Sequence, residues 1–169
     1  MSKPKFFIIF LTLFSTAIFA FVNIGVGYGI NNNNWVVRVG YEDNMFSLNG
    51  NYFVNLEWGI DGSILFETPL GVSTGPMIGI VNDLQNNKIY MNYGGFIGYK
   101  YKGQKGQFDI KIALLMEYGT SLNFLDNLFA SFRTYIPDPP GMKMKDKLYV
   151  EMSYFKQRFY IVVGLLEPF

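Results

Sequence analysis

The charged residues that could carry acid–base chemistry recur at alternate positions within short stretches of this 169-residue sequence. In one stretch, Asp109, Lys111 and Glu117 fall on the same side, and carboxylates placed together can serve as general acid and general base. The same even spacing is also typical of ion pairs along one face of a β-strand. We favour the ion-pair interpretation, because the sequence lacks the other groups that catalysis usually needs.

The composition excludes most catalytic and metal-binding devices. The sequence has no His and no Cys, which removes the commonest general base, the usual zinc and haem ligand, and thiolate chemistry. Lys and Arg number 14 against 13 Asp and Glu, so a net charge of +1 provides no attraction to nucleic acid. Asp43 and Asp126 have Asn neighbours, but their spacing matches no calcium loop. We expect no enzyme activity, no cofactor, no metal and no nucleic-acid partner.

The first 20 residues have the pattern of a secretory signal peptide. Lys3 and Lys5 precede an uncharged run, residues 6–20, which ends with the small residues Ala17 and Ala20. This run is shorter than the roughly 20 apolar residues that a membrane-crossing helix needs, although a short N-terminal anchor is the alternative. We expect cleavage after Ala20, which makes residues 1–20 a signal peptide and residues 21–169 a single exported domain.

Apolar and polar residues alternate with a period of two through most of residues 21–169, which predicts β-strands with one apolar face. The alternation is regular in residues 22–30, 35–42, 51–60, 89–101 and 107–119, and weaker in 64–68, 77–82, 128–136, 148–155 and 159–166. Asp61-Gly62 reads as a turn, and Asn49-Gly50 could also split a strand. No segment has a helical period. We predict an all-β, closed, antiparallel up-and-down transmembrane β-barrel of 8–10 strands, ten by this count.

The polar faces of these strands favour a narrow enclosed interior over a water-exposed surface. They carry many Gly and Asn residues, which a solvated strand face usually avoids. The apolar faces of the five regular strands carry no charge, as expected for a face that meets lipid. The charges on the polar faces are of both signs and can pair with one another. We predict an interior ion-pair network of Arg38, Glu42, Glu57, Lys100, Asp109, Lys111, Glu117, Arg133 and Glu151.

Aromatic residues on the apolar faces gather near the ends of the predicted strands. Rings that are apolar in body and polar at one edge collect at the headgroup level of a membrane. We predict an aromatic girdle of Tyr28, Trp35, Tyr41, Tyr52, Tyr99, Tyr101, Tyr118 and Tyr154.

With a signal-like start, about 150 exported residues, alternating strands and a terminal Phe169, the sequence resembles the small outer-membrane β-barrels of the OmpA/OmpX type. In that group the last strand ends in Phe after apolar residues at alternate positions, and the barrel-assembly machinery reads this signal. Ile161, Val163, Leu165 and Phe169 match the pattern, and Glu167 departs from it. The resemblance implies an outer-membrane location, lipid and the assembly machinery as partners, and a closed barrel.

Two functions follow from the two ways in which the apolar face can point. If the face meets lipid, the protein is a monomeric integral outer-membrane barrel with a structural, adhesive or narrow-permeability role, because ten strands leave little open lumen. If the face points inward, the protein is a secreted or periplasmic barrel that binds an apolar ligand, as lipocalins do. We favour the first.

Overall fold

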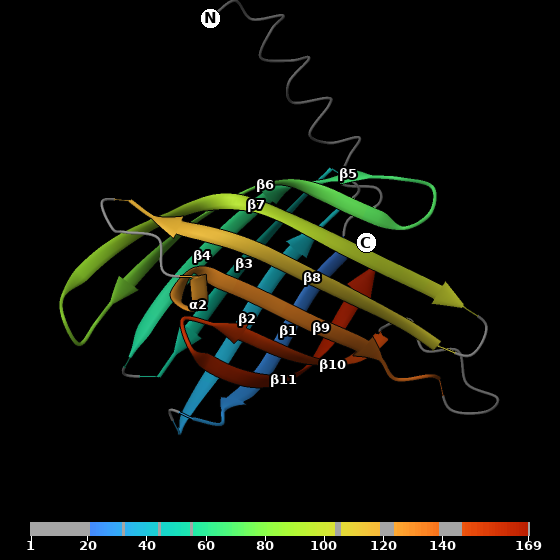
Figure 1. Cartoon of the computed structure of the whole chain (residues 1–169). Helices are drawn as coiled ribbons and strands as arrows, with labels where there is room; N and C mark the ends of the chain where they lie inside the picture. Colours follow the sequence, from blue (N-terminus) through green and yellow to red (C-terminus); the bar gives the residue numbers. More distant parts are fainter. Residues whose placement is uncertain are drawn as a thin grey trace, which may run out of the picture.

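The computed structural model describes residues 21–168 except 32, 44, 55, 104–105, 119–123 and 139–146. Strands dominate this part of the chain (Figure 1). They are β1 (Phe21–Gly29), β2 (Asn34–Glu42), β3 (Phe46–Phe53), β4 (Glu57–Ile64), β5 (Phe66–Glu67), β6 (Val72–Asp83), β7 (Lys88–Gly103), β8 (Gly106–Glu117), β9 (Leu128–Tyr135), β10 (Lys147–Phe155) and β11 (Arg158–Pro168). One short helix, α2 (Phe124–Asn127), precedes β9.

The strands close into a barrel. Each strand pairs antiparallel with its neighbours. Because β1 pairs with β11 and β4 pairs with β6, the main sheet has no unpaired edge strand. Strand β5 continues β4 past Leu65 and pairs with β6 alone, which leaves ten strands in the closed wall of the described chain. This confirms the predicted closed, antiparallel, up-and-down barrel and its ten strands.

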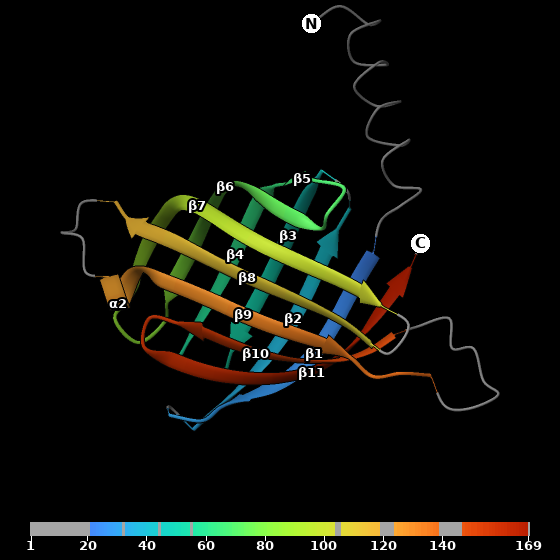
Figure 2. The same ribbon diagram turned by 45° about the vertical axis from the view of Figure 1, so that its right-hand side comes forward.

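The strands are strongly tilted, and those of the front wall cross those of the back wall (Figure 2). A path round the barrel can be followed from each residue to its paired residue on the next strand. From Lys100 this path passes Glu151 and Glu57 and returns to β7 at Lys88, twelve residues away from its start. With strands about 4.8 Å apart and a rise of about 3.3 Å per residue, this shift tilts the strands by roughly 40°.

The two ends of the barrel differ in their connections. Strands β2, β4, β7 and β9 end, and β3, β6, β8 and β10 begin, at the end of the barrel where the chain enters β1 and leaves β11, which we call the terminal end. Strands β1, β3, β6, β8 and β10 end, and β2, β4, β7, β9 and β11 begin, at the opposite, distal end. Helix α2 therefore lies at the distal end, directly before β9 (Figure 2).

Several predicted strand boundaries were wrong. The expected strand 51–60 is two strands, because the chain turns at residues 54–56, where the Leu56 N–H donates to the Phe53 carbonyl at 3.1 Å. Asn49-Gly50 and Asp61-Gly62 lie within β3 and β4, where both dipeptides pair across the sheet. The expected strands 64–68 and 77–82 are the end of β4 with β5, and a longer β6. The four-residue helix α2 was not expected.

Side chains alternate between the barrel interior and its outer surface, as the period of two predicted. In β2, Val36, Arg38 and Gly40 are buried, whereas Val37 and Val39 are exposed. In the described strands, Glu167 is the one charged residue on the outward phase, and it lies at the end of β11. The outer wall is therefore apolar and the polar face points inward.

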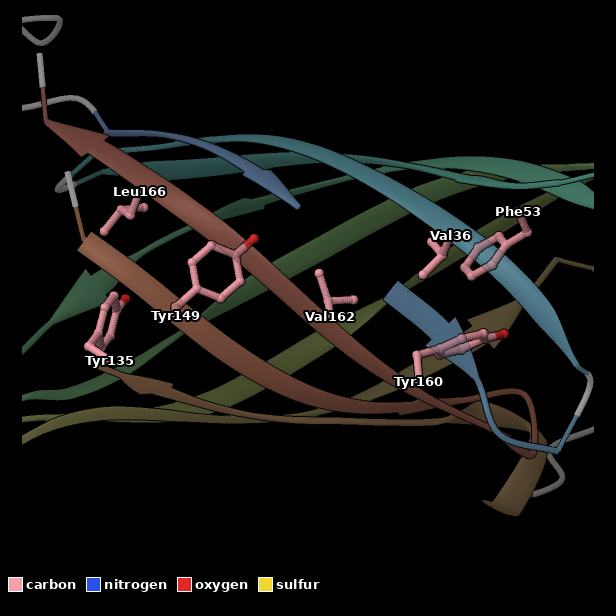
Figure 3. Packing of buried hydrophobic residues seen from close by; sticks show 7 residues of the cluster. All are labelled: Val36, Phe53, Tyr135, Tyr149, Tyr160, Val162 and Leu166. Atoms are coloured by element: carbon pink, nitrogen blue, oxygen red, sulfur yellow. The ribbon is translucent and has the colours of Figure 1, made fainter. Parts of the chain in front are cut away.

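The seam where β1 meets β11 is covered from inside by Tyr149 of β10. Its ring is fully buried, beside Val162 and Leu166 of β11 (Figure 3). Gly25 and Gly164 are paired across the seam, and a Cβ on Gly164 would lie 2.6 Å from the Tyr149 Cζ atom. A Cβ on Gly25 would lie 2.9 Å from the Tyr149 hydroxyl. The Tyr149 ring thus occupies the space that side chains at positions 25 and 164 would fill. This contact joins β10 to β1 and β11.

We expect Gly164→Ala to destabilise the barrel by about 1–3 kcal/mol, because the new methyl group collides with Tyr149 and with the Ile24 carbonyl. Gly50→Ala is the matched control, since its Cβ would face the outside with the nearest atom at 3.7 Å. Equilibrium urea unfolding of the two variants measures the difference. Equal stabilities would show that the ring does not hold the seam.

Candidate functional site: the barrel lumen

The centre of the lumen holds a buried cluster formed by Glu151 of β10 with two arginines. Arg38 of β2 forms an ion pair with one carboxylate oxygen of Glu151. Arg133 of β9 binds the other, Oε2, through its Nη2 at 2.8 Å and its Nε at 2.9 Å. The Arg38 Nε also donates to the Asn51 Oδ1 at 2.7 Å. Because the Glu151 side chain is 4% exposed, this cluster is shielded from water and ties three strands together.

The cluster continues toward the terminal end as a chain of alternating charges. Glu42 of β2 lies 3.9 Å from Arg133 and pairs with Lys100 of β7. Lys100 in turn lies 3.8 Å from Glu67 of β5, at the barrel rim. These pairs connect strands far apart in the sequence through the interior, so they cross-link the wall from inside.

A second group of ion pairs lies at the distal end. Glu57 of β4 pairs with Arg158 of β11 at 2.8 Å, and Glu117 of β8 pairs with Lys156 at 3.1 Å. The Lys156 amine also lies 4.5 Å from the centre of the Tyr90 ring. Lys156 and Arg158 were not among the predicted network residues. Arg158 directly precedes the predicted strand 159–166, in which Phe159 points outward. Extending the alternation by one residue would have placed Arg158 on the inward face.

Three charged groups of the lumen lack an ion pair among the described residues: Asp61, Asp109 and Lys111. Asp61 accepts a hydrogen bond from the Asn49 Nδ2 at 3.1 Å. Asp109 accepts one from the Tyr135 hydroxyl at 2.7 Å, while its Oδ1 is buried without a hydrogen-bond partner. Seven of the nine predicted network residues are therefore in ion pairs, whereas Asp109 and Lys111, like Asp61, are uncommitted, meaning that they have no ion pair. Asp61 was missed because Asp-Gly was read as a turn.

Lys111 is held by neutral groups. Its amine donates to the Ser63 Oγ at 3.1 Å and lies 4.3 Å from the centre of the Phe96 ring. Ser63 is itself 2.7 Å from the Ser47 Oγ. These contacts orient the amine toward the lumen.

An apolar layer fills the distal half of the lumen between the two groups of ion pairs. On one side Phe53 packs on Tyr160 with ring centres 4.8 Å apart, near Val36 (Figure 3). On the other, Phe129 and Phe155 pack beside the buried Leu115 and Met77. Phe53 and Leu115 share the inward phase of their strands with polar residues, so alternation gives the direction of their side chains but not their packing.

Side chains of the described lumen line two small cavities. A cavity of about 80 Å³ is bordered by the charged residues of the terminal half, including Glu42, Lys100, Asp109, Lys111 and Arg133. One of about 60 Å³ lies within the apolar layer, against Phe53, Met77, Phe155 and Tyr160. Arg38, Asn51, Asp61 and Phe129 border both cavities and so form the partition between them. Side chains of the lumen therefore separate the two cavities.

The residues of the predicted girdle lie near both ends of the barrel, on the outward phase. Tyr28, Trp35, Tyr52, Tyr118 and Tyr154 lie near the distal end, and Tyr41, Tyr99 and Tyr101 lie near the terminal end. Neighbouring rings contact one another: Tyr28 meets Trp35 edge-on at 5.3 Å, and Tyr101 stacks on Phe108 at 5.2 Å. Tyr41 also donates to Asp43 at 3.2 Å, and Asp43 accepts two backbone N–H groups of its own turn.

Ile161, Val163 and Leu165 of the predicted assembly signal are exposed on the outward face of β11. Phe169 and residues 1–20, where the signal peptide was expected, lie outside the described residues.

Among the described residues, no three carboxylate, His or Cys side chains come together as a metal site would require. No helix in the described ranges is long and apolar enough to cross a membrane.

No protein-family model and no curated protein matches the sequence. Among solved structures, the chain is similar to the KdgM porin, with 14% identity, a TM-score of 0.49, and coverage of 88% of this chain and 99% of the porin. The KdgM porin in complex with disordered oligogalacturonate gives the same values. A structure from the de novo design of transmembrane β-barrels has 12% identity, a TM-score of 0.39, and coverage of 90% and 96%. The likeness is one of barrel fold.

We expect Glu151→Gln to destabilise the barrel by about 3–5 kcal/mol, because it leaves two buried guanidinium groups without their shared carboxylate. The matched control is Asp138→Asn, which breaks the pair with Lys147, whose side chain is 41% exposed, and should cost at most about 1 kcal/mol. Urea unfolding at two salt concentrations tests this. An equal loss in both variants would contradict a stabilising role for the central cluster.

Proposed function

We propose that the protein is an integral outer-membrane β-barrel whose filled polar lumen allows at most narrow permeability. The observation that carries the proposal is the direction of the side chains: the apolar faces point out and the charges point in. Its partners are then membrane lipid and, at the C-terminal strand, the barrel-assembly machinery. The proposal includes a monomeric state and no catalytic activity.

The outer wall supports a lipid environment. Val37 and Ile112, at the middle of their strands, have 40% and 47% of their surface exposed. A soluble protein rarely exposes a continuous apolar surface of this extent, whereas a membrane barrel requires one. Closure of the sheet also satisfies backbone N–H and C=O groups within the protein, as a hydrocarbon environment demands. The export pattern of the first 20 residues agrees with an outer-membrane location.

The alternative, a soluble barrel that carries an apolar ligand inside, requires the opposite arrangement. Its interior would be lined by the aliphatic faces and its charges would face water. Here Arg38 and Glu151 are buried in the lumen, and Ile24, Val26 and Ile97 are exposed. We therefore do not favour it.

The lumen supports a low permeability. The central ion pairs, the apolar layer and the partition between the two cavities leave spaces of only about 80 and 60 Å³. Barrel diameter grows with strand number, and porins of 16–18 strands leave an aqueous channel, so a wall of ten strands encloses a narrower space.

We expect Ile112→Arg to reduce the free energy of folding into lipid vesicles by about 2–4 kcal/mol, because it places a charge at mid-membrane. Ile89→Arg, at the distal start of β7 where the side chain is 72% exposed, is the matched control and should cost no more than about 1 kcal/mol. Urea titration of vesicle-inserted protein measures both. If neither substitution costs folding energy, the outer wall does not lie in lipid.

In planar bilayers we expect small conductance steps or none, because ion pairs and aromatic rings fill the lumen. Single-channel recording of the folded protein measures this, with a large-pore porin as the positive control for the membrane. Stable, wide, multi-state openings would contradict the narrow-permeability role.

A further inference from the structure

The three uncommitted charges of the lumen border the same cavity. Asp61, Asp109 and Lys111 all line the space of about 80 Å³ in the terminal half of the barrel. The other charges on its wall are paired with one another: Arg38 and Arg133 with Glu151, and Lys100 with Glu42. A buried polar atom without a partner, such as the Asp109 Oδ1, requires an explanation in a native structure.

The three groups are arranged with the positive group between the two negative ones. Lys111 and Asp109 are neighbouring inward residues of β8, and Lys111 also contacts Ser63, the next inward residue after Asp61 on β4. Alternate residues of a strand are separated by roughly 6.6 Å along its length. Neither carboxylate forms an ion pair with the amine, and the contact with Ser63 places the amine on the side of Asp61. A molecule that carries both charges a few atoms apart would fit between the amine and Asp61.

The available hydrogen-bonding capacity agrees with such a molecule. The Lys111 ammonium has three N–H donors, and among the described residues Ser63 accepts one. Asp61 receives one hydrogen bond, from Asn49, and a carboxylate can accept several. The cavity exceeds the roughly 10–15 Å³ that one water needs, so it has space for a solute of a few heavy atoms.

We propose that this cavity is a binding site for a small zwitterion of the amino-acid type, with Lys111 binding its carboxylate and Asp61 binding its ammonium group. The inference rests on the proposed function and deepens it, because it names the class of solute that the narrow lumen accepts. A single anion or a single cation would satisfy only one side of the site and leave the other without a partner.

The test uses glycine as the probe and the full barrel folded in vesicles, with binding measured by isothermal titration calorimetry. We expect saturable binding of glycine, and at least tenfold weaker binding of sodium acetate and of methylammonium chloride, each of which carries half of the charge pattern. Lys111→Met and Asp61→Asn should each weaken glycine binding at least tenfold. Lys102→Met, which removes an exposed lysine at the terminal end of β7, should leave it unchanged.

The same samples are run unheated on a gel to establish that each variant is folded and inserted. If the wild-type barrel is inserted but binds no glycine, or binds acetate or methylammonium equally well, the zwitterion site is wrong and the membrane barrel stands. If folded Asp61→Asn and Lys111→Met bind glycine as the wild type does, the site is also wrong. If the chain folds only in water, the proposed function fails, and glycine binding by that soluble form would still support the site.

Discussion

A polypeptide that meets hydrocarbon must pair its backbone N–H and C=O groups with one another, and the rest of this structure depends on that constraint. The sheet meets it by closing on itself, with β1 paired to β11 along nine residues of register. Closure in turn requires tilt, and the twelve-residue shift round the wall tilts the strands by roughly 40°. Tyr149, seated over Gly25 and Gly164, shows how closely the seam is packed.

The lumen follows from the same constraint, because every charge excluded from the outer wall must be accommodated inside. Most of these charges form ion pairs. Glu151 is shared by two arginines, and Lys156 and Arg158 pair with carboxylates at the distal end. An apolar layer separates the two groups of pairs. The ion pairs thus link strands of the wall from inside.

The fold could be predicted from the sequence because alternation reports the two faces of a strand directly: Val37 and Arg38 are assigned to opposite sides by position alone. Strand ends were less predictable. Asp61-Gly62 has the composition of a turn but pairs within β4, since tertiary pairing overrides local turn preference, and Val54 and Leu56 looked like strand residues but lie in a turn. The identity of ion-pair partners was not predictable, because contacts such as Arg38 with Glu151 depend on tilt and on which strands face each other.

The direction of the apolar face is tested most directly by site-directed spin labelling in lipid vesicles, and the absence of Cys makes single labels unambiguous. Labels introduced by Ile112→Cys on the outer wall and by Ser131→Cys in the lumen would be compared for collision with oxygen, which concentrates in lipid, and with a polar nickel reagent. We expect the label at position 112 to favour oxygen strongly and the label at 131 not to. Preferential collision of the position-112 label with the polar reagent would contradict the account.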